Sequence, residues 1–141
     1  MTEKTVTGEI RAIGNLMRRR MESQRIGCPY GYILHFLSKN ADKNVYQKDI
    51  EKEFSIRPAT ATQALNQLER EGYIKREISK EDGRLKKIAL TPKGMEMDEK
   101  AKCEIDKTES LIRKNLSDSE IEQFFNLTAK IIDGFDENAD K

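Results

Sequence analysis

A helix with an apolar stripe on one side and few charges on the other, residues 58–71, constrains this chain more than any other segment. Three apolar residues recur at the spacing of a helix face that packs on a core: Ala61, Leu65 and Leu68. The other side carries Thr62, Gln63, Asn66 and Arg70. Between residues 55 and 68 the only charged side chain is Arg57. Because a helix in the major groove of DNA must keep carboxylates away from phosphates and offer hydrogen bonds to base edges, this segment predicts a DNA-reading helix.

Turn signals mark both ends of this helix. Pro58 suits the first helical position, and Gly72 suits a left-handed C-cap. Upstream, residues 47–54 have a shorter helical pattern, and only residues 55–57 separate the two helices. A helix, a short turn and a polar-faced helix form the helix-turn-helix arrangement, with Ile56 expected as the apolar plug of the turn. An ordinary helical hairpin with a solvated face is the alternative interpretation.

Two segments after Gly72 alternate apolar and polar residues with the period of a half-buried strand. The apolar positions are Ile74, Ile78, Ile88 and Leu90. All four share one face only if the connecting loop, residues 79–85, has an odd length. The loop and its base project Lys80, Arg84 and Lys86. A hairpin after a recognition helix is a wing, and an arginine at its tip suits a narrow, negative minor groove. The alternative is a solvated charged loop, because Glu81 and Asp82 lie in the same tip.

The order and spacing of several short motifs resemble the MarR family of winged-helix transcriptional regulators. The matching segments are Gln47-Lys48-Asp49-Ile50, Thr60-Ala61-Thr62, Leu68-Glu69-Arg70-Glu71-Gly72-Tyr73-Ile74, Asp82-Gly83-Arg84 and Ile88-Ala89-Leu90-Thr91-Pro92-Lys93-Gly94. Residues 82–91 look like the wing signature of that family, D-x-R-x-x-x-(V/I)-x-L-T, complete and in register. Outside residues 47–91 the chain resembles the family only in length and helical pattern.

The resemblance implies a homodimer that represses transcription from a roughly palindromic DNA operator and is released by an effector. On the matching positions, the residues expected in the major groove are Arg57, Pro58, Ala59, Thr60, Thr62, Gln63 and Asn66. Arg84 is expected in the minor groove, with Lys86 beside it on the wing. Half-sites should lie about 10 bp apart, as for other helix-turn-helix dimers, and Gln63 favours adenine over guanine. A winged-helix protein-interaction module or antirepressor that binds no operator is the alternative function.

These elements predict one domain that is mainly α with a small β wing (α+β). Its expected parts are a winged helix-turn-helix over residues 30–91, dimerisation helices over residues 5–26 and 92–135, and a frayed tail over residues 136–141. Residues 117–120 read Ser-Asp-Ser-Glu, a capping box that opens the last helix. A second subunit is the most economical cover for the apolar stripes of the first and last helices. A monomer with a bundled tail is the alternative.

Three residues are predicted to line an effector pocket: Met17, Tyr30 and Leu34. In the family that the chain resembles, a small aromatic or lipophilic effector lodges between the dimer helices and the winged helix-turn-helix. Methionine adapts its shape to varied ligands. The same residues at helical spacing also fit an ordinary core, which is the competing interpretation.

The charge distribution fits DNA better than the total does. The net charge is +1, but residues 43–91 hold eleven Lys and Arg against eight Asp and Glu, an excess of +3. With 36% charged residues and no apolar run approaching the ~18 residues of a membrane span, we expect a soluble protein. The polar start lacks the apolar segment of a signal peptide, and two cysteines fit a reducing cytoplasm.

Catalytic and metal-binding patterns are missing from the sequence. His35 is the single histidine, Cys28 and Cys103 are isolated, and a zinc site needs three or four ligands. Without a Gly-rich phosphate loop as well, we expect no enzymatic activity, no cofactor and no metal. Cys28 precedes Pro29 at the start of a predicted helix, where the helix dipole favours a thiolate. A cysteine-based redox-sensing regulator is therefore a second alternative, against a buried or idle thiol.

Overall fold

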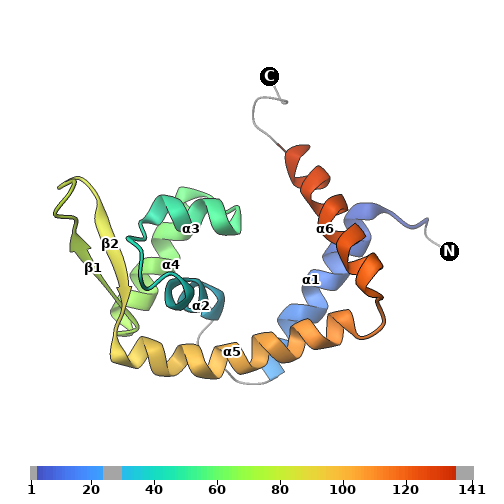
Figure 1. The fold of residues 1–141 in the computed structure, drawn as a ribbon, viewed down its shortest axis with the longest axis horizontal. Coiled ribbons are helices and arrows are strands. Elements are labelled where there is room, and N and C mark those ends of the chain that lie inside the picture. Colours follow the sequence, from blue (N-terminus) through green and yellow to red (C-terminus); the bar gives the residue numbers. More distant parts are fainter. Residues whose placement is uncertain (1–2, 24–29, 136–141) are drawn as a thin grey trace. The chain divides into compact units, whose positions relative to one another are not determined.

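The structure is a computed structural model that describes residues 3–23 and 30–135, which form six helices and a two-stranded sheet (Figure 1). The elements are α1 (Val6–Ser23), α2 (Gly31–Lys39), α3 (Gln47–Phe54), α4 (Pro58–Arg70), β1 (Ile74–Ile78), β2 (Lys86–Leu90), α5 (Pro92–Arg113) and α6 (Asp118–Asp133). The chain divides into two compact units, Met1–Ile105 and Asp106–Lys141. This order of elements confirms the predicted, mainly α architecture with a small β wing. None of the described helices has the length and apolarity to cross a membrane.

The core of the first unit joins α2, α3 and α4 to the base of the β-hairpin. The largest fully buried side chains are Leu34, Ile50, Leu65 and Leu68. Burying a side chain of this size contributes roughly 1.5–3 kcal/mol, so these residues hold the three helices together. Ile74 and Ile88 of the hairpin join the same cluster. The backbone N–H of Ile88 also donates to the carbonyl of Val45 at 2.8 Å, which ties β2 to the segment before α3.

The turn between α3 and α4 has the predicted length and plug. Ile56 packs against the core, and its N–H donates to the carbonyl of Glu51 at 3.1 Å to close the end of α3. Ser55 adopts a left-handed φ of +50°, which is uncommon for a residue with a side chain. Gly72 has a φ of +84°, which confirms the left-handed conformation predicted after α4.

The hairpin has the predicted register but not the predicted burial. Ile74 lies opposite Leu90, and Ile78 lies opposite Lys86, so residues 79–85 form the odd loop. The expectation that Ile78 is half-buried is wrong, because the core ends nearer the base of the hairpin and leaves Ile78 67% exposed. Tyr73, next to β1, is buried beside the start of α5.

The start of α5 packs closely on the start of the hairpin. Thr91 caps the start of α5, because its Oγ1 accepts a hydrogen bond from the N–H of Gly94 at 3.0 Å. A Cβ atom added to Gly94 would overlap the backbone carbonyl of Tyr73. Only glycine therefore allows this close approach of the two backbones.

Replacing Gly94 with alanine should lower the free energy of unfolding by roughly 1–3 kcal/mol, because α5 or the hairpin must shift to accept the methyl group. Urea unfolding followed by circular dichroism measures the change. Gly83→Ala is the matched control, because a Cβ there meets no atom within 4 Å. Equal stability of Gly94→Ala and the unchanged protein would contradict this packing.

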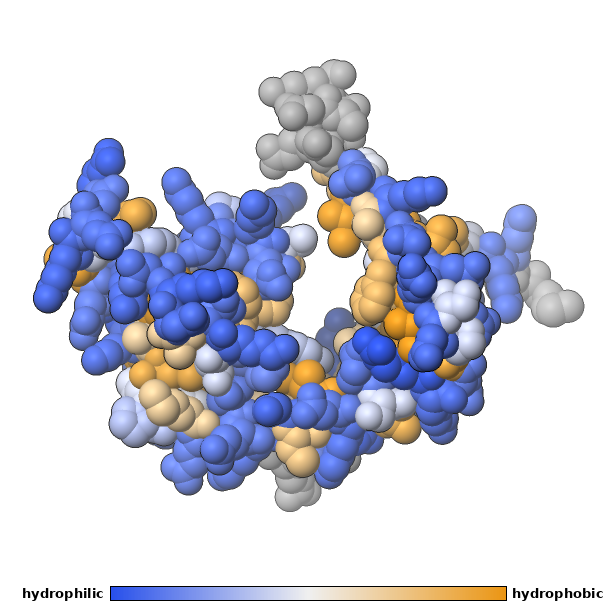
Figure 2. All heavy atoms as spheres, viewed as in Figure 1, coloured by the Kyte–Doolittle hydropathy of each residue, from blue (hydrophilic) through white to orange (hydrophobic). Residues whose placement is uncertain are grey.

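The second unit contains the end of α5 and all of α6. Ser117 Oγ accepts from the N–H of Glu120 at 3.1 Å, and Glu120 Oε1 accepts from the N–H of Ser117 at 2.9 Å, which confirms the predicted capping box. No residue of α6 is buried among the described residues. Its exposed large apolar residues are Phe124, Phe125, Leu127, Ile131 and Ile132, and Figure 2 shows apolar side chains over this helix. In the first unit, α1 likewise exposes Val6, Ile10, Ile13 and Leu16.

Candidate nucleic-acid interface

α4 has one side in the core and one in solvent. Its buried residues are Ala61, Ala64, Leu65 and Leu68. The exposed residues include every one predicted to enter the major groove: Arg57, Pro58, Ala59, Thr60, Thr62, Gln63 and Asn66. Arg57 is the N-cap, with an extended backbone, and Pro58 is the first helical residue. The fold therefore presents these residues together on the side of α4 that faces away from the core.

Gln47, at the start of α3, reaches across to α4. Its Nε2 lies 3.0 Å from Thr62 Oγ1, 3.3 Å from the carbonyl oxygen of Pro58 and 3.1 Å from Glu51 Oε2. Carbonyl and carboxylate oxygens accept hydrogen bonds, so Nε2 is the donor and the Thr62 hydroxyl oxygen is an acceptor. This amide joins the two helices of the motif at the predicted DNA-binding surface.

Arg76 on β1 also contacts this surface, and it is absent from the predicted site residues. Its Nη2 donates to Asn66 Oδ1 and to Glu69 Oε1, each at 2.7 Å. The hydrogen bond from Arg76 holds the pKa of Glu69 below its ordinary value, so this carboxylate on α4 is paired with a cation. Strand alternation indicates the face, because Arg76 lies on the same side of β1 as Ile74. The partner on α4 depends on packing.

The tip of the wing is closed by hydrogen bonds from its own residues. Asp82 Oδ1 accepts from the backbone N–H of Arg84 at 3.0 Å and from Arg84 Nε at 3.3 Å. The backbone bond from Arg84, followed by its side-chain bond, lowers the pKa of Asp82. Ser79 Oγ accepts from the N–H of Glu81 at 3.2 Å and lies 3.2 Å from the Tyr46 hydroxyl, which ties the wing to the start of α3. The Arg84 side chain itself is 90% exposed.

Replacing Arg84 with alanine should lower affinity for a specific duplex about tenfold and leave thermal stability unchanged, because the side chain is exposed and its expected contact is with DNA. A fluorescence-anisotropy titration measures the affinity. Lys75→Ala is the matched control. It also removes one positive charge, but from the exposed side of β1, away from the tip of the wing. An equal loss in both variants would indicate a general charge effect and not a wing-tip contact.

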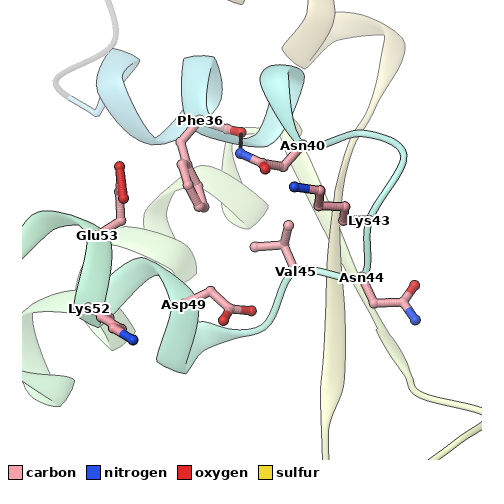
Figure 3. A pocket seen from close by; sticks show the side chains of 8 residues that line it. All are labelled: Phe36, Asn40, Lys43, Asn44, Val45, Asp49, Lys52 and Glu53. Carbon is pink, nitrogen blue, oxygen red and sulfur yellow. Dashed lines mark hydrogen bonds between the residues drawn. The ribbon is translucent and has the colours of Figure 1, made fainter.

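The predicted effector residues lie in different surroundings. Leu34 is fully buried, Tyr30 packs against the core, and Met17 is partly exposed on α1. A separate open cavity of about 410 Å³ lies between α2, α3 and the segment that joins them (Figure 3). Its lining residues are Phe36, Asn40, Lys43, Asn44, Val45, Asp49, Lys52 and Glu53. Six of these eight residues are polar or charged, and none is one of the three predicted effector residues, so the effector pocket stays a prediction.

The residues that a catalytic, metal-binding or redox function could use are His35, Cys28 and Cys103. His35 Nδ1 lies 3.3 Å from Asp98 Oδ1, a contact that joins α2 to α5. Cys103 is an exposed thiol on α5, and Cys28 lies outside the described residues. In the described part of the chain, no group of three or more His, Cys, Asp or Glu residues could hold a metal ion. Redox sensing stays a prediction.

A three-residue turn, a solvent-facing second helix and a hairpin packed beside it define a winged helix-turn-helix protein. The MarR family profile matches residues 29–85. The chain aligns at 29% identity over 94 residues with BilQ, an HTH-type transcriptional regulator of Clostridioides difficile (strain CD3). The alignment covers 67% of this chain and 62% of BilQ, less than two thirds of that regulator.

Two solved structures match almost the whole chain. The transcription regulator MarR from Oenococcus oeni PSU-1 is 26% identical with a TM-score of 0.81, and the match covers 92% of this chain and 99% of MarR. The MepR–DNA complex of S. aureus is 26% identical with a TM-score of 0.83, and the match covers 94% of this chain and 100% of MepR. The chain is therefore similar to MarR-family winged-helix transcriptional regulators, in sequence over residues 29–85 and in fold over almost its whole length.

Proposed function

We propose that this regulator is a sequence-specific repressor that binds double-stranded DNA in the cytoplasm, as a homodimer on a pseudo-palindromic operator. Residues 1–141 act as one domain, in which residues 30–91 contact DNA and residues 5–26 and 92–135 form the dimer. Binding of a small aromatic or lipophilic effector releases the operator. The protein acts by binding and not by catalysis.

The exposed side of α4 is the observation that supports DNA binding most strongly. It offers hydroxyl and amide groups with no carboxylate between residues 55 and 68, and Glu69 at its end is paired with Arg76. Such a surface does not repel phosphates, and base edges can hydrogen-bond to it. The seven exposed residues from Arg57 to Asn66 enter the major groove, while Arg84 of the wing reaches the minor groove and Lys86 binds DNA beside it. The MepR structure that matches this chain is a complex with DNA.

Exposed apolar side chains support the homodimer. None of the described residues of α6 is buried, although several are large and apolar. For example, Phe124 is 50% exposed and Ile132 is 61% exposed. Contiguous apolar surface of this kind marks an interaction site in a soluble protein. A second copy of the chain covers it with the same surface, as twofold symmetry requires, and doubles the DNA contacts.

The effector releases the operator by shifting the dimer from a state that binds DNA tightly to a state that binds it weakly. Half-buried Met17 and Tyr30 and buried Leu34 form the proposed effector-binding region. An effector acts only through different affinities for the two states. If aromatic acids that demonstrably bind the protein leave its DNA affinity unchanged, this mechanism is wrong.

Salt-dependent binding to a selected duplex tests the proposal. Sites are selected from a random duplex library with the full chain, and affinity for the best site is measured across a range of salt concentrations. Phosphate contacts release counterions, so log affinity should fall steeply and linearly with log salt concentration. A winged-helix protein-interaction module or antirepressor that binds no operator would enrich no site and show no such slope.

A further inference from the structure

Two neighbouring side chains on the exposed side of α4 are held from behind by other elements. Thr62 and Asn66 are one helical turn apart, so their side chains are neighbours on that side. The oxygen of each accepts a hydrogen bond from within the protein: Thr62 from Gln47 on α3, and Asn66 from Arg76 on β1. These contacts determine which atoms remain available to an external partner.

The orientation of the Asn66 amide follows from the chemistry of Arg76. A guanidinium has only donors, so the Asn66 atom 2.7 Å from Arg76 Nη2 must be the oxygen. Nη2 is also bound to Glu69 Oε1 at 2.7 Å, and the Arg76 side chain is only 18% exposed. Both contacts are made by the one nitrogen Nη2, and the Asn66 amide nitrogen, with two N–H groups, is left for a partner.

The Thr62 hydroxyl, like the Asn66 amide, accepts a hydrogen bond from within the protein and keeps its donor for a partner. Gln47 Nε2 also lies near two obligate acceptors, the carbonyl oxygen of Pro58 and a carboxylate oxygen of Glu51. The Gln47 amide therefore cannot be turned to place its oxygen there. Because the Thr62 oxygen accepts from Gln47, its own proton is available for an outside acceptor.

We propose that Arg76 and Gln47 are positioning residues that make this part of α4 a hydrogen-bond donor surface. Asn66 and Thr62 then bind acceptor atoms of DNA, which are purine N7, guanine O6 or phosphate oxygens. The two-bond pair with adenine would need the Asn66 oxygen to accept from adenine N6 as well as from Arg76. The inference rests on the proposed DNA-binding function and adds the direction of these hydrogen bonds.

Modified duplexes test the direction directly. The selected site is synthesised with single 7-deazapurines, which lack the N7 acceptor, and separately with single methylphosphonates, which alter one phosphate. At one nucleotide of the site, the modification should weaken binding of the unchanged protein about three- to tenfold. The same modification should leave the affinity of Asn66→Ala unaffected, and we call this difference coupling. Coupling to a 7-deazapurine assigns the acceptor to a base, and coupling to a methylphosphonate assigns it to the backbone. No coupling at any position overturns the inference.

Arg76→Met tests the positioning role at the coupled position. Without the guanidinium, Asn66 is no longer held, so the ratio of affinities for unmodified and modified duplex should fall toward one. Arg76→Lys retains a donor and should restore part of that ratio. A role confined to folding would weaken binding to both duplexes equally, so an unchanged ratio in Arg76→Met overturns the positioning role. Thermal unfolding of each variant separates lost folding from lost contacts.

The outcomes also separate this inference from the function on which it rests. If the unchanged protein enriches no duplex and shows no salt dependence, the proposed function and the inference both fail. If it binds a selected duplex with a steep salt dependence but shows no coupling to Asn66, the inference alone fails.

Discussion

Ile132→Lys in α6 should convert the dimer to monomers and lower operator affinity about a hundredfold or more. Ile132 is 61% exposed in the single chain and lies on the apolar side of α6. A lysine there would bury an unpaired charge in the dimer interface. The helix itself tolerates the change, because a cation in the last turn interacts favourably with the helix dipole. Separation of the two half-site contacts removes the gain from bivalent binding, which is roughly 10²–10⁴-fold.

Sedimentation velocity measures the oligomeric state, and an anisotropy titration measures the affinity. Gln123→Lys is the matched control, because it introduces the same side chain at an exposed position on the opposite side of α6. That variant should remain dimeric and bind normally. An intact dimer with normal operator binding in Ile132→Lys would refute the assignment of this α6 surface to the dimer.

Gln63→Glu should weaken operator binding about 10- to 100-fold without changing the fold or the dimer. The two side chains have the same shape, and Gln63 is exposed on α4, so the protein without DNA loses no packing. In the complex, the new carboxylate would face phosphates and replace an amide at a base edge, where a good contact is worth about 1–3 kcal/mol of discrimination.

Competition titrations against the selected duplex measure this loss. Gln123→Glu makes the same chemical change on α6, which is outside the proposed DNA interface. The DNA affinity of this variant should therefore stay within about twofold of that of the unchanged protein. Equal binding by Gln63→Glu and the unchanged protein would remove this side of α4 from the interface.

The helix-turn-helix could be predicted from sequence because its boundaries have local causes. Pro58 fixes the start of α4, Gly72 takes the left-handed conformation after it, and the apolar spacing places Leu65 and Leu68 inside. The odd length of the hairpin loop followed from the parity of the apolar positions. The polar residues of α4 were predicted to contact DNA because they lie opposite its apolar stripe. The structure confirms that they are exposed together on one side of α4.

The contacts made between elements could not be read in the same way. Period two places Arg76 on the inner face of β1, but a long, flexible side chain has many rotamers, and its bonds to Asn66 and Glu69 arise only when β1 packs on α4. Periodicity also cannot show where a core ends, which is why Ile78 was expected to be covered. The left-handed Ser55 has no sequence signal, since serine seldom adopts that conformation.

Methylation protection on the selected duplex tests most directly whether α4 reads the major groove while the wing reaches the minor groove. Dimethyl sulfate modifies guanine N7 in the major groove and adenine N3 in the minor groove. We predict two protected major-groove segments about 10 bp apart, each with minor-groove protection alongside that disappears in Arg84→Ala while the major-groove protection persists. Protection of a single segment, or minor-groove protection that Arg84→Ala leaves intact, would contradict this arrangement.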